Sequence, residues 1–76
     1  MKCITINDVK IGNIYKANLF YIDSTFYFKP IKIYSNKYAH NIRMEFGWCS
    51  INLRQHNFCD KDSFYELSQE EKAALL

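Results

Sequence analysis

The chain has 76 residues, of which 49% are hydrophobic and 17% aromatic, and its formal net charge is +2. This composition excludes a disordered chain, because large rings bury enough apolar surface to offset the ordering entropy of a short domain. The length leaves little room for a deep substrate pocket, and no apolar run approaches the roughly 20 residues that span a bilayer. We therefore expect one small domain over residues 1–76 with no membrane segment.

Cysteine content and residue usage indicate the compartment of the protein and the kind of genome that encodes it, and the charge is unevenly distributed along the chain. Three cysteines without a Cys-x-x-Cys pair favour reduced thiols and a cytoplasmic location. Residues 1–59 carry a net charge of +5 and residues 60–76 a net charge of −3, a mild asymmetry. Residue types with AT-rich codons (Phe, Tyr, Met, Ile, Asn, Lys) fill 38 positions, whereas Gly, Ala, Arg and Pro fill 9. We expect an AT-rich genome, such as that of a low-GC bacterium or one of its phages or mobile elements.

The first part of the chain favours strands separated by tight turns. Residues 3–6 are a short strand candidate, and Gly12-Asn13 is a turn pair that tolerates positive φ. A second strand is expected over residues 14–22. Asp23, Ser24 and Thr25 then predict the turn of an aromatic β-hairpin within Leu19–Tyr34, because their side chains hydrogen-bond local backbone.

The second arm of this hairpin changes phase. Phe26 and Phe28 share one face, whereas strict alternation would place Ile31 and Ile33 on the opposite face. Proline cannot donate to a strand ladder and is found at edges, at first strand positions and at bulges. A bulge at residues 29–30 would add one residue and place both pairs in the core.

A second phase change is predicted further along. Residues 35–41 are polar and indicate a connecting loop, after which Ile42, Met44 and Phe46 alternate with charged residues as in a half-buried strand. Beyond Gly47 the inward set becomes Cys49, Ile51 and Leu53, and Trp48 is expected outside the core. A glycine bulge or a sharp bend accounts for the change.

The C-terminal part is expected to contain a loop, a strand and a helix. Residues 55–63 indicate a loop, and residues 64–67 a last short strand. Ser68 and Glu71 have the spacing of a capping box, which predicts a helix from Gln69 to the C-terminus. Such a short helix needs to dock in order to persist.

These elements predict a mainly β fold of five to six strands over residues 1–67 with a helix over residues 68–76. Residues 9–15 resemble the entry of SH3-like barrels, and residues 64–67 resemble their closing strand. This resemblance implies a small antiparallel SH3-like barrel; a strongly bent or open sheet, or an OB-like barrel, is the alternative. The expected core is Ile4, Ile6, Ile14, Phe26, Phe28, Ile31, Ile33, Ile42, Met44, Phe46, Ile51, Leu53, Phe64 and Leu67.

The residue pattern gives little support to catalysis or to a metal site. His40, Cys49, His56 and Cys59 could supply four tetrahedral ligands, but their spacing is looser than the tight pairs of structural zinc sites. No cysteine or serine is singled out with a base, no carboxylate pair stands apart, and no glycine-rich phosphate loop is present. We expect neither catalytic residues nor a cofactor.

Binding to a protein partner is therefore the leading expectation. The chain has more rings than a core of this size can hold, and exposed aromatics often mark contact surfaces. A small, non-catalytic protein of this composition resembles phage or mobile-element proteins that bind and sterically inhibit a host protein, including anti-CRISPR inhibitors. An edge strand could also pair two copies into a homodimer. The expected partner-binding residues are Tyr21, Tyr27, Lys29, Arg43, Trp48 and Arg54.

Nucleic-acid binding is the alternative function. Rings on a strand surface stack bases while lysines meet phosphates, and this chain interleaves the two residue types. The relevant segments are Tyr15-Lys16, Tyr27-x-Lys29, Lys32-x-Tyr34 and Lys37-Tyr38.

Overall fold

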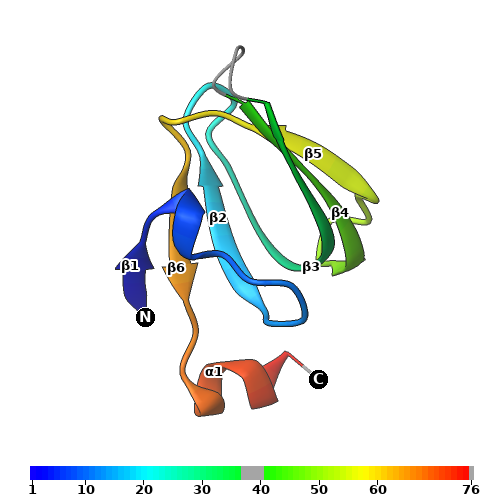
Figure 1. The fold of residues 1–76 in the computed structure, drawn as a ribbon. Helices are drawn as coiled ribbons and strands as arrows, with labels where there is room; N and C mark the ends of the chain where they lie inside the picture. Colours follow the sequence, from blue (N-terminus) through cyan, green and yellow to red (C-terminus); the bar gives the residue numbers. More distant parts are fainter. Residues whose placement is uncertain (37–40, 76) are drawn as a thin grey trace.

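The computed structural model describes residues 1–36 and 41–75. Within them, six strands form one antiparallel sheet in the order β1-β6-β2-β3-β4-β5, and the sheet does not close into a barrel (Figure 1). The mainly β prediction is confirmed, in its bent, open-sheet form. The elements are β1 (Lys2–Ile4), a 3-10 helix (Ile6–Asp8), β2 (Tyr15–Leu19), β3 (Ser24–Asn36), β4 (Asn41–Cys49), β5 (Gln55–Phe58), β6 (Ser63–Glu66) and α1 (Gln69–Ala74).

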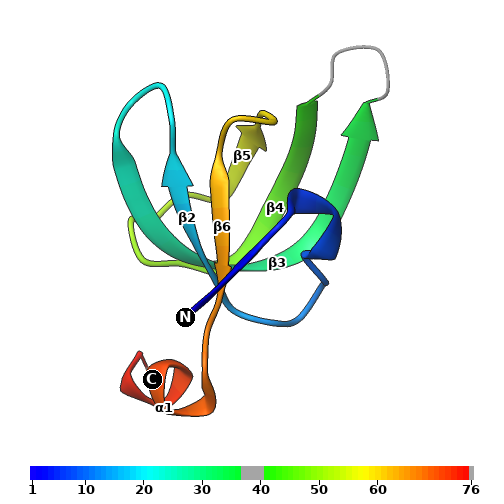
Figure 2. The same cartoon turned by 90° about the vertical axis from the view of Figure 1, so that its left-hand side faces the viewer.

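The sheet curls tightly around its core. In a flat sheet, β5 and β6 would lie about 19 Å apart, because four strand spacings of about 4.8 Å separate them. Instead, the rings of Phe58 on β5 and Phe64 on β6 have centroids only 4.9 Å apart. The long strand β3 produces much of this curvature: its first half pairs with β2 and its second half with β4 (Figure 2). The concave side therefore holds the core, and the convex side faces outward.

The core is an aromatic cluster with contributions from β2 to β6. Predicted core residues Phe26, Phe28, Met44, Phe46, Phe64 and Leu67 are buried, and Ile4, Ile6, Ile33 and Ile42 pack against them partly buried. Ile14 is intermediate in exposure. The prediction is wrong for Ile31, Ile51 and Leu53, which are exposed. Buried residues that it missed are Val9, Tyr15, Ala17, Leu19, Pro30 and Phe58.

The predicted aromatic hairpin is present, with its turn earlier than expected. β2 ends at Leu19, and β3 begins at Ser24, so residues 20–23 form the connection. Asp23 adopts the left-handed conformation, with φ 46°, which short polar residues tolerate best. Ser24 and Thr25 are strand residues, because they pair with Leu19 and Asn18.

Both predicted phase changes occur, and they face each other across one strand pair. Lys29 pairs with Trp48, Pro30 with Phe46, and Lys32 with Glu45, so the register shifts on both sides of Pro30. Gly47 is the extra residue on β4, and Ile31 is the extra residue on β3. The extra residue on β3 keeps both Pro30 and Ile33 on the core side, which is the change of phase that the sequence predicts. The extra residue itself, Ile31, points outward and not into the core.

The segment after Gly47 differs from the prediction. Trp48 lies outside the core and Cys49 is partly buried, as expected, but the chain leaves the sheet after Cys49. Alternation therefore ends before Ile51 and Leu53, and neither side chain reaches the core. The predicted loop over residues 55–63 contains β5, which pairs with β4 from Ile42 to Glu45.

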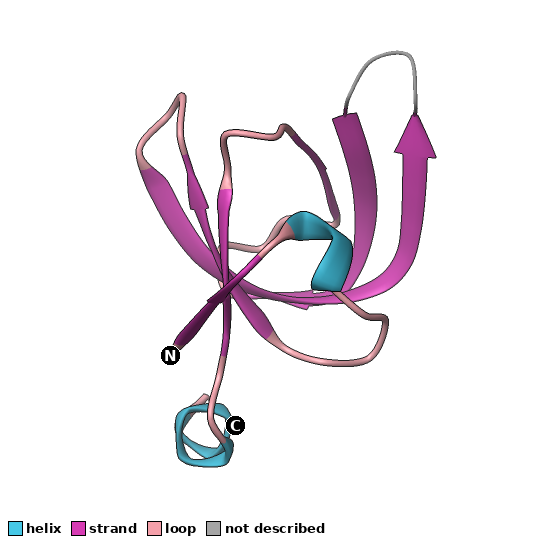
Figure 3. Cartoon of the chain, turned by 60° about the vertical axis from the view of Figure 1, so that its left-hand side comes forward, coloured by secondary structure: helices cyan, strands magenta, loops and turns pink. Residues whose placement is uncertain are grey.

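The remaining connections are local. The predicted loop over residues 35–41 is shorter, since β3 continues to Asn36 and β4 starts at Asn41; residues 37–40 lie outside the described residues. The predicted helix is confirmed with its capping box: the Glu71 N–H donates to Ser68 Oγ at 3.2 Å. α1 buries none of its own residues and lies beyond the end of β6, away from both sheet faces (Figures 2 and 3). The N-terminal ammonium lies 3.4 Å from Glu71 Oε1.

Candidate binding surfaces

A band of cations and rings covers the convex side of the sheet. Alternation along each strand places these side chains opposite the buried ones, and cross-strand pairing sets them side by side. Lys16 on β2 pairs with both Tyr27 on β3 and Tyr65 on β6. We call this surface the convex face and define it as Lys16, Tyr27, Lys29, Lys32, Tyr34, Arg43, Glu45 and Tyr65.

Cation–ring contacts order part of the convex face. The Lys16 ammonium lies 5.7 Å from the centroid of the Tyr65 ring, and the Arg43 guanidinium lies 4.3 Å from that of Tyr34. Arg43 also donates from Nη1 to Gln55 Oε1 at 3.1 Å. Cations are drawn to the negative face of an aromatic ring, so these contacts hold both partners close to the sheet.

Glu45 is the acidic member of the convex face. Its carboxylate raises the pKa of the Tyr34 phenol, mainly by accepting a hydrogen bond from the hydroxyl, which the ionised phenolate could not donate. Lys32 pairs with Glu45 across the strands. The Glu45 carboxylate therefore has Tyr34 and Lys32 as neighbours on the convex face.

The two bulges create a second surface, with exposed apolar side chains among polar ones, next to the convex face. Ile31 is 48% exposed, Trp48 39% and Leu53 36%. Together with Arg54 they line an open cleft of about 540 Å³ beside Gly47. We call these four residues the bulge patch. Trp48 lies at its border with the convex face, because it pairs with Lys29.

The tip of the β2–β3 hairpin is a third exposed apolar site. Phe20, Tyr21 and Ile22 are 61%, 71% and 67% exposed. The Lys61 ammonium lies 5.4 Å from the Phe20 ring centroid and 5.7 Å from that of Tyr21. The Asp62 carboxylate links this hairpin tip to the segment before β6. Its Oδ1 accepts from the Phe20 N–H at 3.0 Å, and its Oδ2 accepts from the Cys59 N–H at 2.9 Å.

The six predicted partner-binding residues do not form one cluster. Tyr27, Lys29 and Arg43 lie on the convex face, and Trp48 and Arg54 belong to the bulge patch. Tyr21 lies apart from them, at the hairpin tip. Ile31 and Leu53 are surface residues that the sequence prediction missed: the bulge expected at residues 29–30 moves Ile31 into the core, and alternation extended beyond Cys49 assigns Leu53 to the core.

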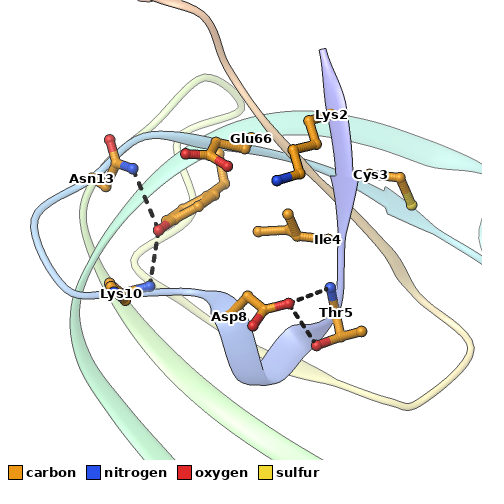
Figure 4. A pocket seen from close by; sticks show the side chains of 9 residues that line it. Lys2, Cys3, Ile4, Thr5, Asp8, Lys10, Asn13 and Glu66 are labelled. Atoms are coloured by element: carbon orange, nitrogen blue, oxygen red, sulfur yellow. Dashed lines mark hydrogen bonds between the residues drawn. The ribbon is translucent and has the colours of Figure 1, made fainter.

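A polar cleft of about 640 Å³ opens beside β1 (Figure 4). Its polar groups hold the local structure together. The Tyr15 hydroxyl accepts from the Lys10 N–H at 3.0 Å and from Asn13 Nδ2 at 3.4 Å. Asp8 Oδ2 accepts from the Thr5 N–H at 3.2 Å and from its hydroxyl at 3.0 Å. The lining residues Lys2 and Glu66 face each other as a cross-strand pair.

The candidate metal ligands are not brought together within the described residues. No group of three or more His, Cys, Asp or Glu there could hold a metal ion. Cys49 and Cys59 are free thiols, and His40 lies outside the described residues.

The ring of His56 packs edge-on against Phe58, with centroids 4.8 Å apart. Burial lowers the pKa of His56, and the nearby Asp62 partly opposes that shift.

Comparison with protein-family models, with curated proteins and with solved structures finds no match to this chain. Within the described residues, no helix has the length and apolar character needed to cross a membrane. Any functional proposal for this chain therefore depends on its own surfaces, chiefly the convex face and the bulge patch.

Proposed function

We propose that the protein is a small non-enzymatic binding protein that docks a protein partner on its bulge patch. The observation that supports this most is the joint exposure of Ile31, Trp48 and Leu53 around one cleft. Single exposed apolar residues are ordinary on a protein surface, but a group of them beside a cleft is typical of contact sites.

The residue types of the bulge patch also favour a protein partner. Trp and Arg are enriched among the residues that carry most of the binding energy at protein interfaces. Here Trp48 supplies a large ring at the cleft, and Arg54 adds a charged group able to pair with a partner carboxylate. Ile31 and Leu53 flank them with aliphatic surface.

The partner in this proposal is a host protein, and the mechanism is steric. A curled sheet of this size is a compact body that blocks a partner's working surface without chemistry of its own. The many residue types with AT-rich codons support an origin in a phage or mobile element. Small proteins of such elements include inhibitors of host defence.

The test compares variants of the bulge patch with a variant elsewhere on the surface. Tagged wild-type protein captures its partner from a nuclease-treated lysate of a low-GC bacterium, and the isolated pair is then measured by interferometry. Trp48→Ala and Leu53→Ser should each weaken binding about 30-fold or more, the effect of a hot spot of about 2 kcal/mol. Ile11→Ala, which removes an exposed aliphatic side chain from another loop, should leave affinity unchanged.

Circular dichroism separates loss of binding from loss of folding. The proposal is wrong if both bulge-patch variants are folded and bind like the wild type. It is equally wrong if Ile11→Ala weakens binding as much as they do.

A further inference from the structure

The convex face has the charge of a surface that meets a polyanion. Within the described residues it contains four cations, namely Lys16, Lys29, Lys32 and Arg43, against the single acid Glu45. The other described acids lie elsewhere: in the polar cleft, in the connections at residues 23 and 60–62, at the end of β6 and in α1. The weak net charge of the whole chain therefore conceals a strongly cationic face.

Rings and cations alternate in a single row across this face. Tyr65, Lys16 and Tyr27 come from three adjacent strands and are directly paired, in the order β6-β2-β3. Adjacent strands lie about 4.8 Å apart, so β6 and β3 are about 10 Å apart at this row, with Lys16 on the strand between them. A row of this kind offers two stacking platforms and a phosphate contact within one line.

The cationic surface continues along β3. Lys29 is two residues beyond Tyr27, and Lys32 follows after the bulge, so the three residues span roughly 17 Å of strand at about 3.3 Å per residue. All of them lie on the convex side. The Arg43 guanidinium covers the Tyr34 ring at 4.3 Å, whereas the Lys16 ammonium lies farther from the Tyr65 ring, at 5.7 Å, so Tyr27 and Tyr65 are the rings of this face that are the more open to stacking.

No helix of the described chain covers this surface. α1 lies beyond β6, and the 3-10 helix lies at the end of β1 (Figures 1 and 3). Tyr27, Tyr65 and Lys16 are intermediate in exposure, so each keeps part of its surface accessible to a ligand.

We propose that the convex face binds single-stranded nucleic acid, with bases stacked on Tyr27 and Tyr65 and phosphates contacting Lys16, Lys29 and Lys32. An acidic peptide would match the charge but has no flat groups for the two rings, whereas every base has a π face. Duplex bases are already stacked on each other, so the rings favour unpaired bases. This proposal concerns a surface distinct from the bulge patch and stands independently of the proposed protein partner.

The experiment measures the fluorescence anisotropy of labelled 12-nucleotide oligo-dT and oligo-U at 50 mM and 200 mM salt. Three phosphate contacts predict a slope of about −2 in log affinity against log salt, or about a 20-fold loss between these concentrations. Lys16→Gln/Lys29→Gln should leave one contact and reduce that loss to about 3-fold. The control Lys10→Gln/Lys72→Gln removes the same charge away from the convex face and should retain the wild-type slope.

Ring variants test the stacking half of the proposal. Tyr65→Leu should weaken binding about 5-fold or more, and Tyr65→Phe should bind like the wild type, because stacking needs the ring and not the hydroxyl. The proposal is overturned if neither oligonucleotide binds at 50 mM salt, if the control double variant loses as much as the convex-face variant, or if a poly-glutamate peptide or a duplex of equal length binds as tightly. None of these variants replaces a residue of the bulge patch, and Tyr65 and Lys16 lie on strands that do not contribute to it, so this result and the partner-capture result can fail separately.

Discussion

Replacing Gly47 with alanine tests the paired bulges that create the bulge patch. A Cβ at position 47 would lie 2.8 Å from Cγ2 of Ile31, closer than real carbon contacts allow, whereas the next nearest atom, the Lys29 carbonyl oxygen, would be 3.8 Å away. The backbone of Gly47 does not have positive φ, so alanine is conformationally tolerated there. The effect of the substitution therefore depends on one methyl group.

The size of the effect follows from two opposing contributions. Overpacking of this kind costs about 1–3 kcal/mol, and the loss of glycine's freedom in the unfolded chain returns about 0.4–1 kcal/mol. Ile31 is half exposed, so its side chain can rotate away from the new methyl group. This places the cost of overpacking at the lower end of its range, about 1 kcal/mol. We expect Gly47→Ala to destabilise the protein by about 0.5 kcal/mol, which lowers the melting temperature by about 2–4 °C for a domain of this size.

A double-mutant cycle with Ile31→Ala isolates the contact. Once the Ile31 methyl is removed, Gly47→Ala should be neutral or stabilise the protein by up to about 1 kcal/mol. Urea unfolding followed by circular dichroism gives each free energy. Equal effects of Gly47→Ala in both backgrounds would refute the reasoning, because Ile31 and Gly47 would then not face each other.

Two further predictions concern the aromatic core. Phe58→Ala removes the ring that joins β5 to β6 and should lower the free energy of unfolding by about 3–5 kcal/mol. The whole chain is expected to have a free energy of unfolding of roughly 4–11 kcal/mol, so the melting transition should shift strongly or vanish. A variant that melts like the wild type would contradict the curled sheet. Because burial lowers the pKa of His56, the folded state disfavours its protonated form, and stability should fall as pH drops below about 6.5 toward that lower pKa. Melting temperatures between pH 7 and pH 5.5 should decline less for His56→Gln than for the wild type, and parallel declines would exclude this role of His56.

Local signals in the sequence predicted the parts of the fold that local rules control. Gly12 has φ 90° in its turn, Ser68 caps α1, and the phase changes at Pro30 and Gly47 are real bulges. Each of these depends on residues close together in sequence and on the conformational limits of glycine, proline or a cap. Such features can be inferred without knowing what the strands pair with.

The errors arose where pairing between distant segments decides the outcome. β5 has the polar sequence Gln55-His56-Asn57, which predicts a loop, yet its backbone pairs with β4 and Phe58 enters the core. Extending the alternation of β4 beyond Cys49 assigns Ile51 and Leu53 to the core, but the strand ends at Cys49. Burial on a curled sheet is set by which strands meet, and that information is not in any single segment.

The same reason limits prediction of the binding surfaces. Trp48 was expected outside the core because the phase change at Gly47 is visible in the sequence. The row Tyr65, Lys16, Tyr27 depends on β6 pairing with β2, two segments separated by more than forty residues along the chain. The bulge patch likewise requires Ile31 and Leu53 to be exposed beside one cleft, which only the folded chain shows.

Site-specific photo-crosslinking tests the proposed protein-docking surface most directly. A benzophenone amino acid replaces Leu53 in the bulge patch or, as a matched control, Ile11, and each protein is irradiated in nuclease-treated lysate of a low-GC bacterium. The proposal predicts one discrete protein adduct from position 53 that Trp48→Ala abolishes, and no such adduct from position 11. The same adduct from both positions, or none from position 53, would contradict docking on the bulge patch.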